Sequence, residues 1–131
     1  MKAEFDALAI QADQSYWLDG KPFTGIAVCR RTDGTIESEV SFVDGIQSGS
    51  VIDWYPNDQM AFQGTIRNGV YHGECKTWNP NGCLVKVEIY EYGICISKKE
   101  YSASGQLFSE FQITPADPNF ALLELHRRQN Q

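Results

Sequence analysis

Residues 68–84 read NGVYHGECKTWNPNGCL, and this stretch holds both turns of a unit that recurs about every 24 residues. The first turn carries a glycine that recurs with gaps of 25, 24 and 24 residues, at Gly20, Gly45, Gly69 and Gly93. A second turn series recurs with gaps of 24, 24 and 23 residues, at Gly34, Asp58, Gly82 and Gly105. Two turn series in phase indicate one supersecondary unit copied four times, as in a stacked array.

Each unit has the pattern of a β-hairpin. The first turn is Asp-Gly or Asn-Gly in three copies and Tyr92-Gly93 in the fourth, and Asn/Asp-Gly favours a type I′ turn. The second turn, as in Pro80-Asn81-Gly82, suits a three-residue loop, which is a type I turn followed by a left-handed residue that forms a bulge at the turn. The runs between turns are rich in β-branched and aromatic residues, as strands require. The sequence therefore predicts a mostly β protein, an elongated antiparallel β-meander of about four repeated hairpins and eight strands with a C-terminal α-helix.

The strands after the second turn alternate apolar and polar residues with a period of two. One face is predicted to be buried and to carry Ile36, Val40, Phe42, Met60, Phe62, Ile66, Leu84, Tyr90, Leu107, Phe111 and Ile113. The opposite face is polar in the first two copies, with Glu37, Glu39, Ser41, Gln63 and Thr65. Later copies place apolar residues on that second face, at Val85, Val87, Ile89 and Phe108. Such a patch needs a cover or serves as a binding surface.

A short helix after residue 114 is available as that cover. Asp117 is a plausible N-cap, Pro118 suits the first helical position, and Arg127 suits the C-terminal end. We therefore expect the helix to pack over Val85, Val87, Ile89 and Phe108. The chain of 131 residues is then one domain, with a lead-in at 1–18, four repeats at 19–113, and a linker and helix at 114–131.

Composition indicates a folded protein of a reducing compartment. Apolar residues make up 42% of the chain and charged residues 21%, which argues against disorder. No apolar run approaches the ~18 residues of a membrane span, and the N-terminus lacks the pattern of a secretory signal. The four cysteines lack CxxC spacing and favour free thiols over a disulfide framework or a zinc site. We expect a cytoplasmic protein.

The net charge of −6 is concentrated in the first half of the chain. Residues 1–66 hold ten acids and four bases, a balance of −6, whereas residues 67–131 hold seven of each. An acidic surface opposes nucleic-acid binding, because phosphate demands basic side chains, and it also weakens binding to anionic lipid. It suits a basic partner, which a one-sided field would steer, although acidic solvated surfaces are also common and aid solubility.

Candidate catalytic groups are few. His72 lies three residues before Cys75, and such a pair can form a nucleophilic dyad, but His72 follows a turn glycine and suits an exposed loop. Glu37 and Glu39 could pair as acid and base, although carboxylates on a polar strand face are usually just solvated. The glycines punctuate hairpins and form no phosphate-binding loop. We therefore expect no enzyme, no catalytic residues, no cofactor and no metal site.

The repeat resembles the bacterial MORN-repeat-variant family. Residues 19–25 and 33–39 are similar to the opening of such proteins, and residues 68–84 are similar to the repeat core, with NG, HG, an aromatic residue and PNG followed by an apolar residue. The resemblance covers roughly residues 16–113, and Ser97 departs from it where glycine is expected. It implies a hairpin array without catalytic residues. Members are often labelled antitoxins, similar arrays serve as immunity proteins, and eukaryotic relatives act as membrane-proximal scaffolds.

Charge and resemblance together favour a protein-binding role. We expect an immunity or antitoxin protein that neutralises a basic bacterial toxin domain by direct binding. The alternative is a non-catalytic MORN-type scaffold or adaptor, including one at a membrane surface. The predicted contact surface is the polar face of the first two copies, with Glu37 and Glu39, and with Asp53 on the same face beside Tyr55 as an aromatic anchor.

Overall fold

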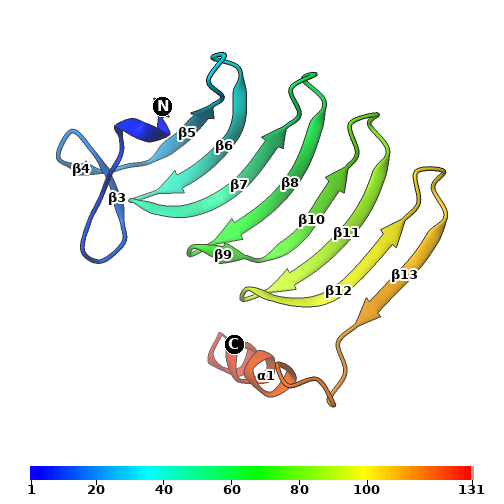
Figure 1. Cartoon of the computed structure of the whole chain (residues 1–131). Helices are drawn as coiled ribbons and strands as arrows, with labels where there is room; N and C mark the ends of the chain where they lie inside the picture. Colours follow the sequence, from blue (N-terminus) through cyan, green and yellow to red (C-terminus); the bar gives the residue numbers. More distant parts are fainter. Residues whose placement is uncertain (131) are drawn as a thin grey trace.

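A computed structural model describes residues 1–130, so Gln131 of the predicted C-terminal segment lies outside the described residues. Within residues 1–130, ten strands form one long open sheet and three more form a small separate sheet (Figure 1). The lead-in comprises β1 (Lys2–Glu4), the 3-10 helix η1 (Phe5–Ala7), β2 (Ala9–Ile10), β3 (Tyr16–Leu18) and β4 (Lys21–Pro22). The repeats comprise β5 (Gly25–Arg30), β6 (Ile36–Val43), β7 (Ile46–Trp54), β8 (Met60–Arg67), β9 (Val70–Tyr71), β10 (Gly73–Trp78), β11 (Leu84–Glu91), β12 (Ile94–Tyr101) and β13 (Leu107–Gln112). The chain ends in α1 (Phe120–Gln129).

Four hairpins build the long sheet in chain order, which confirms the predicted meander. The order is β1-β5-β6-β7-β8-β10-β11-β12-β13, with β9 paired to β8. All pairings along it are antiparallel except that of β1 with β5, which is parallel. The structure thus adds to the eight predicted strands an N-terminal edge strand, β1, and a short strand, β9. The small sheet, β2-β3-β4, precedes the array.

Both turn types are confirmed by the backbone. At the first turn φ is positive at both central residues in every copy, for example 52° at Asn68 and 84° at Gly69. Tyr92 takes the same value of 52°, although a bulky residue adopts this conformation at a cost. At the second turn the left-handed position is held by Gly34, Asp58 (φ 65°), Gly82 and Gly105. In the long sheet, the first turns at Asp44-Gly45, Asn68-Gly69 and Tyr92-Gly93 line one end of the strands and the second turns line the other, the lower and upper ends in Figure 1. The first turn at Asp19-Gly20 joins β3 to β4 of the small sheet.

A β-bulge interrupts each hairpin three residues beyond the second turn. Cys29 pairs with Ser38 but Arg30 pairs with Ile36, so Glu37 is an extra residue on β6. The same shift makes extra residues of Ala61, Val85 and Phe108. An extra residue reverses the alternation of side chains along a strand. The prediction of one continuous apolar face is therefore wrong, because each bulge separates the first apolar residue from those that follow.

The bulges leave the sheet with two different faces. The packed face carries Phe42, Cys75 and Ile113, all of them buried. The open face carries Ser41, Gln63 and Lys76, as the strand registers place them on the opposite side. The predicted polar face corresponds to the open face. Four apolar residues that were predicted on the buried face lie instead on the open face, because each stands between the second turn and its bulge. They are Ile36, Met60, Leu84 and Leu107.

The lead-in and the helix supply cores at the two ends of the array. Near the N-terminus Phe23, Ala27 and Phe42 are buried beneath the side chains of η1 and β3. At the other end Leu123 of α1, with no exposed surface, packs on Ile94 and Ile113. The prediction that the helix covers Val85, Val87, Ile89 and Phe108 is therefore wrong, and Phe108 remains 67% exposed. Among the described residues, no helix has the length and apolar character needed to cross a membrane.

The helix begins slightly later than predicted. The structure places its N-cap at Asn119 rather than at Asp117. Asp117 instead holds the preceding turn, where its carboxylate accepts a hydrogen bond from the Asn119 amide at 2.9 Å. Basic residues do occupy the last turn of the helix, as expected.

Candidate functional site

A row of large side chains crosses the open face beside the second turns. In each hairpin the last residue before the second turn pairs across the bulge with the first strand residue after it. The four pairs are Arg30 with Ile36, Trp54 with Met60, Trp78 with Leu84, and Tyr101 with Leu107. We call Trp54, Trp78 and Tyr101 the aromatic row. All three are half-buried, so part of each ring remains accessible.

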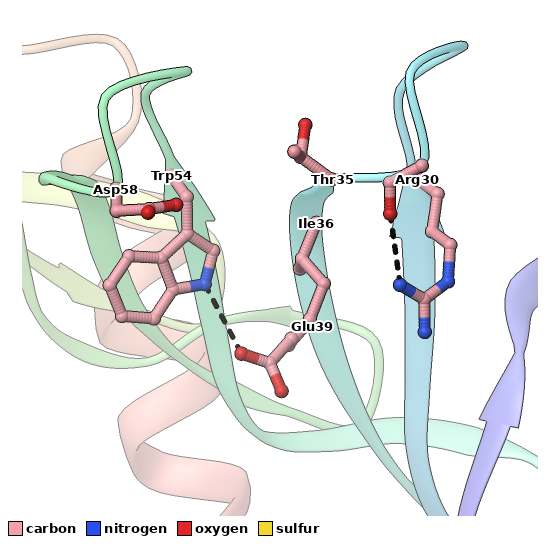
Figure 2. A pocket seen from close by; sticks show the side chains of 7 residues that line it. Arg30, Thr35, Ile36, Glu39, Trp54 and Asp58 are labelled. Atoms are coloured by element: carbon pink, nitrogen blue, oxygen red, sulfur yellow. Dashed lines mark hydrogen bonds between the residues drawn. The ribbon is translucent and has the colours of Figure 1, made fainter.

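The first groove of this row lies between the first two hairpins and has a volume of about 360 Å³. Its lining residues are Arg30, Gly34, Thr35, Ile36, Glu39, Trp54 and Asp58. Figure 2 shows the Trp54 indole and the Glu39 carboxylate pointing toward one another, with Ile36 beside them. The groove thus combines an apolar floor, an aromatic wall and two carboxylates.

Hydrogen bonds fix the groove's side chains. Trp54 Nε1 donates to Glu39 Oε1 at 3.1 Å, and the exposed Lys2 ammonium lies 3.4 Å from Glu39 Oε2. The Glu39 side chain is only 18% exposed. Arg30 is engaged elsewhere, because its guanidinium donates to Glu4 at 2.9 Å and to the Gly34 carbonyl at 3.0 Å. The Arg30 charge is therefore offset by Glu4.

Asp58 stands at the rim of the first groove. It occupies the left-handed place of the second turn, where the other copies have glycine, and it is exposed. Its amide donates to the Tyr55 carbonyl at 3.0 Å, as the turn requires, so the side chain adds a carboxylate to the groove without altering the backbone. Asp is one of the few residues that adopt this conformation readily.

The equivalent positions in the next two repeats carry different side chains. A shift of 24 residues replaces Glu39 by Gln63 and Asp58 by Gly82, and the next step places Val87 and Gly105 there. A groove of about 470 Å³ at the last of these positions, which we call the third groove, is lined partly by Leu84 and Tyr101. The aromatic wall therefore persists along the array, whereas both carboxylates belong to the first groove.

Side chains from successive second turns tie the groove walls together. The Tyr55 hydroxyl donates to the Trp78 carbonyl at 2.7 Å, and the Arg31 guanidinium donates to the Trp54 carbonyl at the equivalent place one repeat earlier. Asn57 Nδ2 donates to the Pro80 carbonyl at 3.0 Å. These bonds hold neighbouring hairpins at a fixed spacing along the aromatic row.

The predicted site residues are only partly brought together. Glu39 lies in the first groove, and Glu37, the extra residue of the first bulge, is exposed two residues before it in the chain. Asp53 pairs with Ser38 and accepts a hydrogen bond from its hydroxyl at 2.7 Å. The expectation that Asp53 shares a face with Glu39 is wrong, because residues 38 and 39 alternate sides. Tyr55 is half-buried and bonded to the Trp78 carbonyl, not presented as a free anchor.

Sequence reasoning missed Trp54 and Asp58 as groove residues. The signal available was the matched spacing of Trp54, Trp78 and Tyr101, combined with the bulge that places each beside an apolar partner. The departure from glycine at Asp58 was a second signal. The predicted contact surface used neither signal.

A second polar cluster fastens the helix to the third and fourth repeats. The Tyr92 amide donates to His72 Nδ1 at 3.0 Å, and the Tyr92 ring stacks on His126 of α1 with centroids 5.1 Å apart. Arg127 donates two hydrogen bonds to the Glu91 carboxylate, at 2.7 and 2.8 Å, and this holds the pKa of Glu91 below its usual value. The cluster is a structural attachment of the helix.

The groups considered for nucleophilic chemistry have other roles here. His72 uses Nδ1 to cap the first turn at Tyr92, as the Thr24 hydroxyl does at Asp44 two repeats earlier. Cys75 is 1% exposed, and burial raises the pKa of its thiol, the opposite of what a reactive thiolate needs. In the part of the chain that the structure describes, all four cysteines are free. Cys75 is buried and Cys83 is exposed, so the thiols do not share one environment.

Comparisons with known proteins give no relative: no family model, no curated protein and no solved structure matches this chain.

Proposed function

We propose that this protein is a non-enzymatic binding protein of the immunity or antitoxin class, which neutralises a basic toxin domain by holding it on the open face. The observation that carries the proposal is the first groove, where two carboxylates flank an indole and an apolar floor. A lysine or arginine side chain of the partner matches each element of this groove.

Each part of a basic side chain has a counterpart in the first groove. Its aliphatic stem packs on Ile36, its cationic head lies over the Trp54 ring, and Glu39 or Asp58 accepts its hydrogen bonds. Because Glu39 already binds Trp54 Nε1 through one oxygen, the other oxygen is available once the exposed Lys2 swings away. Lys2 is 63% exposed, so its displacement costs little.

The charge distribution supports the same partner. The balance of −6 over residues 1–66 places the negative field on the hairpins that form the first groove. Such a field speeds the approach of a basic protein and orients it toward this end of the array. The neutral second half contributes the third groove and the helix, which extend the contact surface.

The test combines retention with neutralisation. The tagged protein and its Glu39→Gln, Asp58→Asn double variant are used to capture proteins from the source cell, and the amount of each captured protein is measured. Each captured protein is then expressed in cells, alone or together with the tagged protein. We expect one basic protein to be lost from the double variant, to arrest growth when expressed alone, and to be tolerated beside the wild type.

The matched control is the Asp19→Asn, Asp44→Asn variant. It removes two charges from the same acidic half but outside the first groove, at the β3–β4 and β6–β7 turns, and Asn is native at the equivalent place of the third copy, Asn68. We expect it to retain the partner. Equal retention by all three proteins would refute groove binding, and a captured partner that does not arrest growth would refute the antitoxin role.

A further inference from the structure

We propose that the aromatic row binds an extended, proline-rich segment of the partner in the polyproline II conformation, laid across the strands with one turn of the segment per hairpin. The inference rests on the proposed protein-binding function and specifies what the open face recognises. Its basis is the spacing of the row and the charge at its two ends.

The spacing of the row matches one polyproline II turn. Trp54 lies on β7, Trp78 on β10 and Tyr101 on β12, and in each case one strand stands between them. Neighbouring strands lie about 4.8 Å apart, so equivalent positions recur every ~9.6 Å. A polyproline II helix has three residues per turn and a rise of 3.1 Å, which gives roughly 9.3 Å per turn. Every third residue of such a segment therefore meets an equivalent position of the aromatic row.

The chemistry of the grooves suits this conformation. Proline rings and other apolar side chains pack on accessible aromatic rings, and the first and third grooves have apolar floors at Ile36 and Leu84. A polyproline II segment has no internal hydrogen bonds and needs none from the inner strands of a sheet, whose backbone groups are already paired. Side-chain packing alone holds it.

Charge sets the direction of the segment. The first groove carries Glu39 and Asp58, whereas further along the open face Lys76 is paired with Glu74 at 3.3 Å and Lys99 lies opposite Glu110. A basic residue of the segment therefore lies in the first groove and its later residues are neutral. Neutral glycans also stack on rows of aromatic rings, but they offer no cation to the two carboxylates, so a basic peptide is the better match.

The test uses synthetic probes and the full-length protein. The first peptide is Ac-Arg-Pro-Pro-Leu-Pro-Pro-Leu-Pro-Pro-amide, the second replaces each proline by glycine or serine, and the third replaces arginine by alanine. Cellohexaose is the glycan probe. Affinity is measured by calorimetry for the wild type, Trp78→Leu, the Glu39→Gln, Asp58→Asn variant, and Trp17→Phe as a control outside the row.

We expect the proline peptide to bind about tenfold more tightly than the flexible one, because a preformed segment loses less conformational freedom. Trp78→Leu should weaken the proline peptide by about tenfold, as the loss of an aromatic anchor does. The carboxylate variant should weaken the arginine peptide and leave the alanine peptide unchanged. Trp17→Phe should bind like the wild type.

Two results would overturn the inference. If the proline and flexible peptides bind equally or neither binds, while the captured partner still depends on Glu39 and Asp58, the polyproline mode is wrong and the protein-binding function stands. If cellohexaose binds in a Trp78-dependent way and the peptides do not, the row is a glycan site. If the peptides bind as expected but the captured partner ignores the groove variants, the proposed function fails instead.

Discussion

Glu39 and Trp54 face one another across neighbouring strands, with the indole Nε1 donating to the carboxylate at 3.1 Å. The bond comes from β6 and β7, which are paired through Ser38 and Asp53 immediately beside it. It fixes the plane of the indole and one oxygen of the carboxylate at the same time. The first groove is therefore preorganised for a cation with an apolar stem, which lowers the entropic cost of binding.

The helix attachment can be tested with two leucines of α1. Leu123 is fully buried against Ile94 and Ile113, whereas Leu125 is 45% exposed. We expect Leu123→Ala to lower the free energy of unfolding by ~2–4 kcal/mol, the usual range for a buried leucine. Leu125→Ala should change it by less than ~0.5 kcal/mol. Urea unfolding measures both, and equal effects would mean that the helix is not held as the structure shows.

Two first-turn glycines with the same φ distinguish the cost of backbone strain from the cost of a steric clash. A Cβ at Gly69 meets nothing within 4 Å, so Gly69→Ala suffers only from its φ of 84°. A Cβ at Gly45, with the same φ of 84°, would lie 2.9 Å from the Tyr16 carbonyl oxygen. We expect Gly69→Ala to cost ~1 kcal/mol and Gly45→Ala distinctly more, as judged by urea unfolding. A smaller loss at Gly45 would contradict the packing of β3 against the second hairpin's first turn.

The turns are the part of the fold that the sequence predicts well. Turn geometry depends on the conformational preferences of two or three residues, so the spacing of Asn68-Gly69 and Pro80-Asn81-Gly82 was sufficient to predict the hairpins and their order. The bulges at Glu37 and Ala61 were not predictable from the same pattern. Apolar residues occur on both sides of each bulge, so a simple period of two runs through it unbroken.

The candidate site was missed for the same reason. If the bulges were absent, Ile36 would lie on the face of the core residues and Asp53 on the face of Glu39. The register instead pairs Ile36 with Arg30 and Asp53 with Ser38. The helix position depends equally on long-range packing. Its partner, Ile113, becomes buried only because the fourth bulge returns that end of β13 to the packed face.

The ion pair between Glu91 and Arg127 predicts a pH-dependent contribution to stability. Hydrogen bonds from Arg127 lower the pKa of Glu91 from its usual value of 4.5. A lowered pKa in the folded state means that the pair stabilises the protein above pH 4.5, and that this contribution is lost as pH falls through the lowered pKa. We therefore expect wild type to be more stable than Arg127→Ala at pH 7 and the difference to vanish in acid. A difference that is constant from pH 7 to pH 3 would contradict the pair.

The thiols should react in an order set by exposure. Cys83 is exposed, whereas Cys29 and Cys95 are half-buried and Cys75 is buried. Burial raises the pKa of Cys29, Cys75 and Cys95, which lowers their thiolate fraction. We expect an alkylating reagent at pH 8 to modify Cys83 first and Cys75 only on unfolding. Mass spectrometry of timed samples reads out the order, and early labelling of Cys75 would be inconsistent with the packed face.

The dissociation rate of the captured partner tests the central claim that the first groove holds a basic side chain. Surface charge acts mainly on association, whereas a contact made in the bound state acts on dissociation. The Glu39→Gln, Asp58→Asn variant should therefore dissociate about tenfold faster than the wild type at moderate salt, and the Asp19→Asn, Asp44→Asn control should dissociate at the wild-type rate. Equal dissociation rates for all three proteins would contradict the claim.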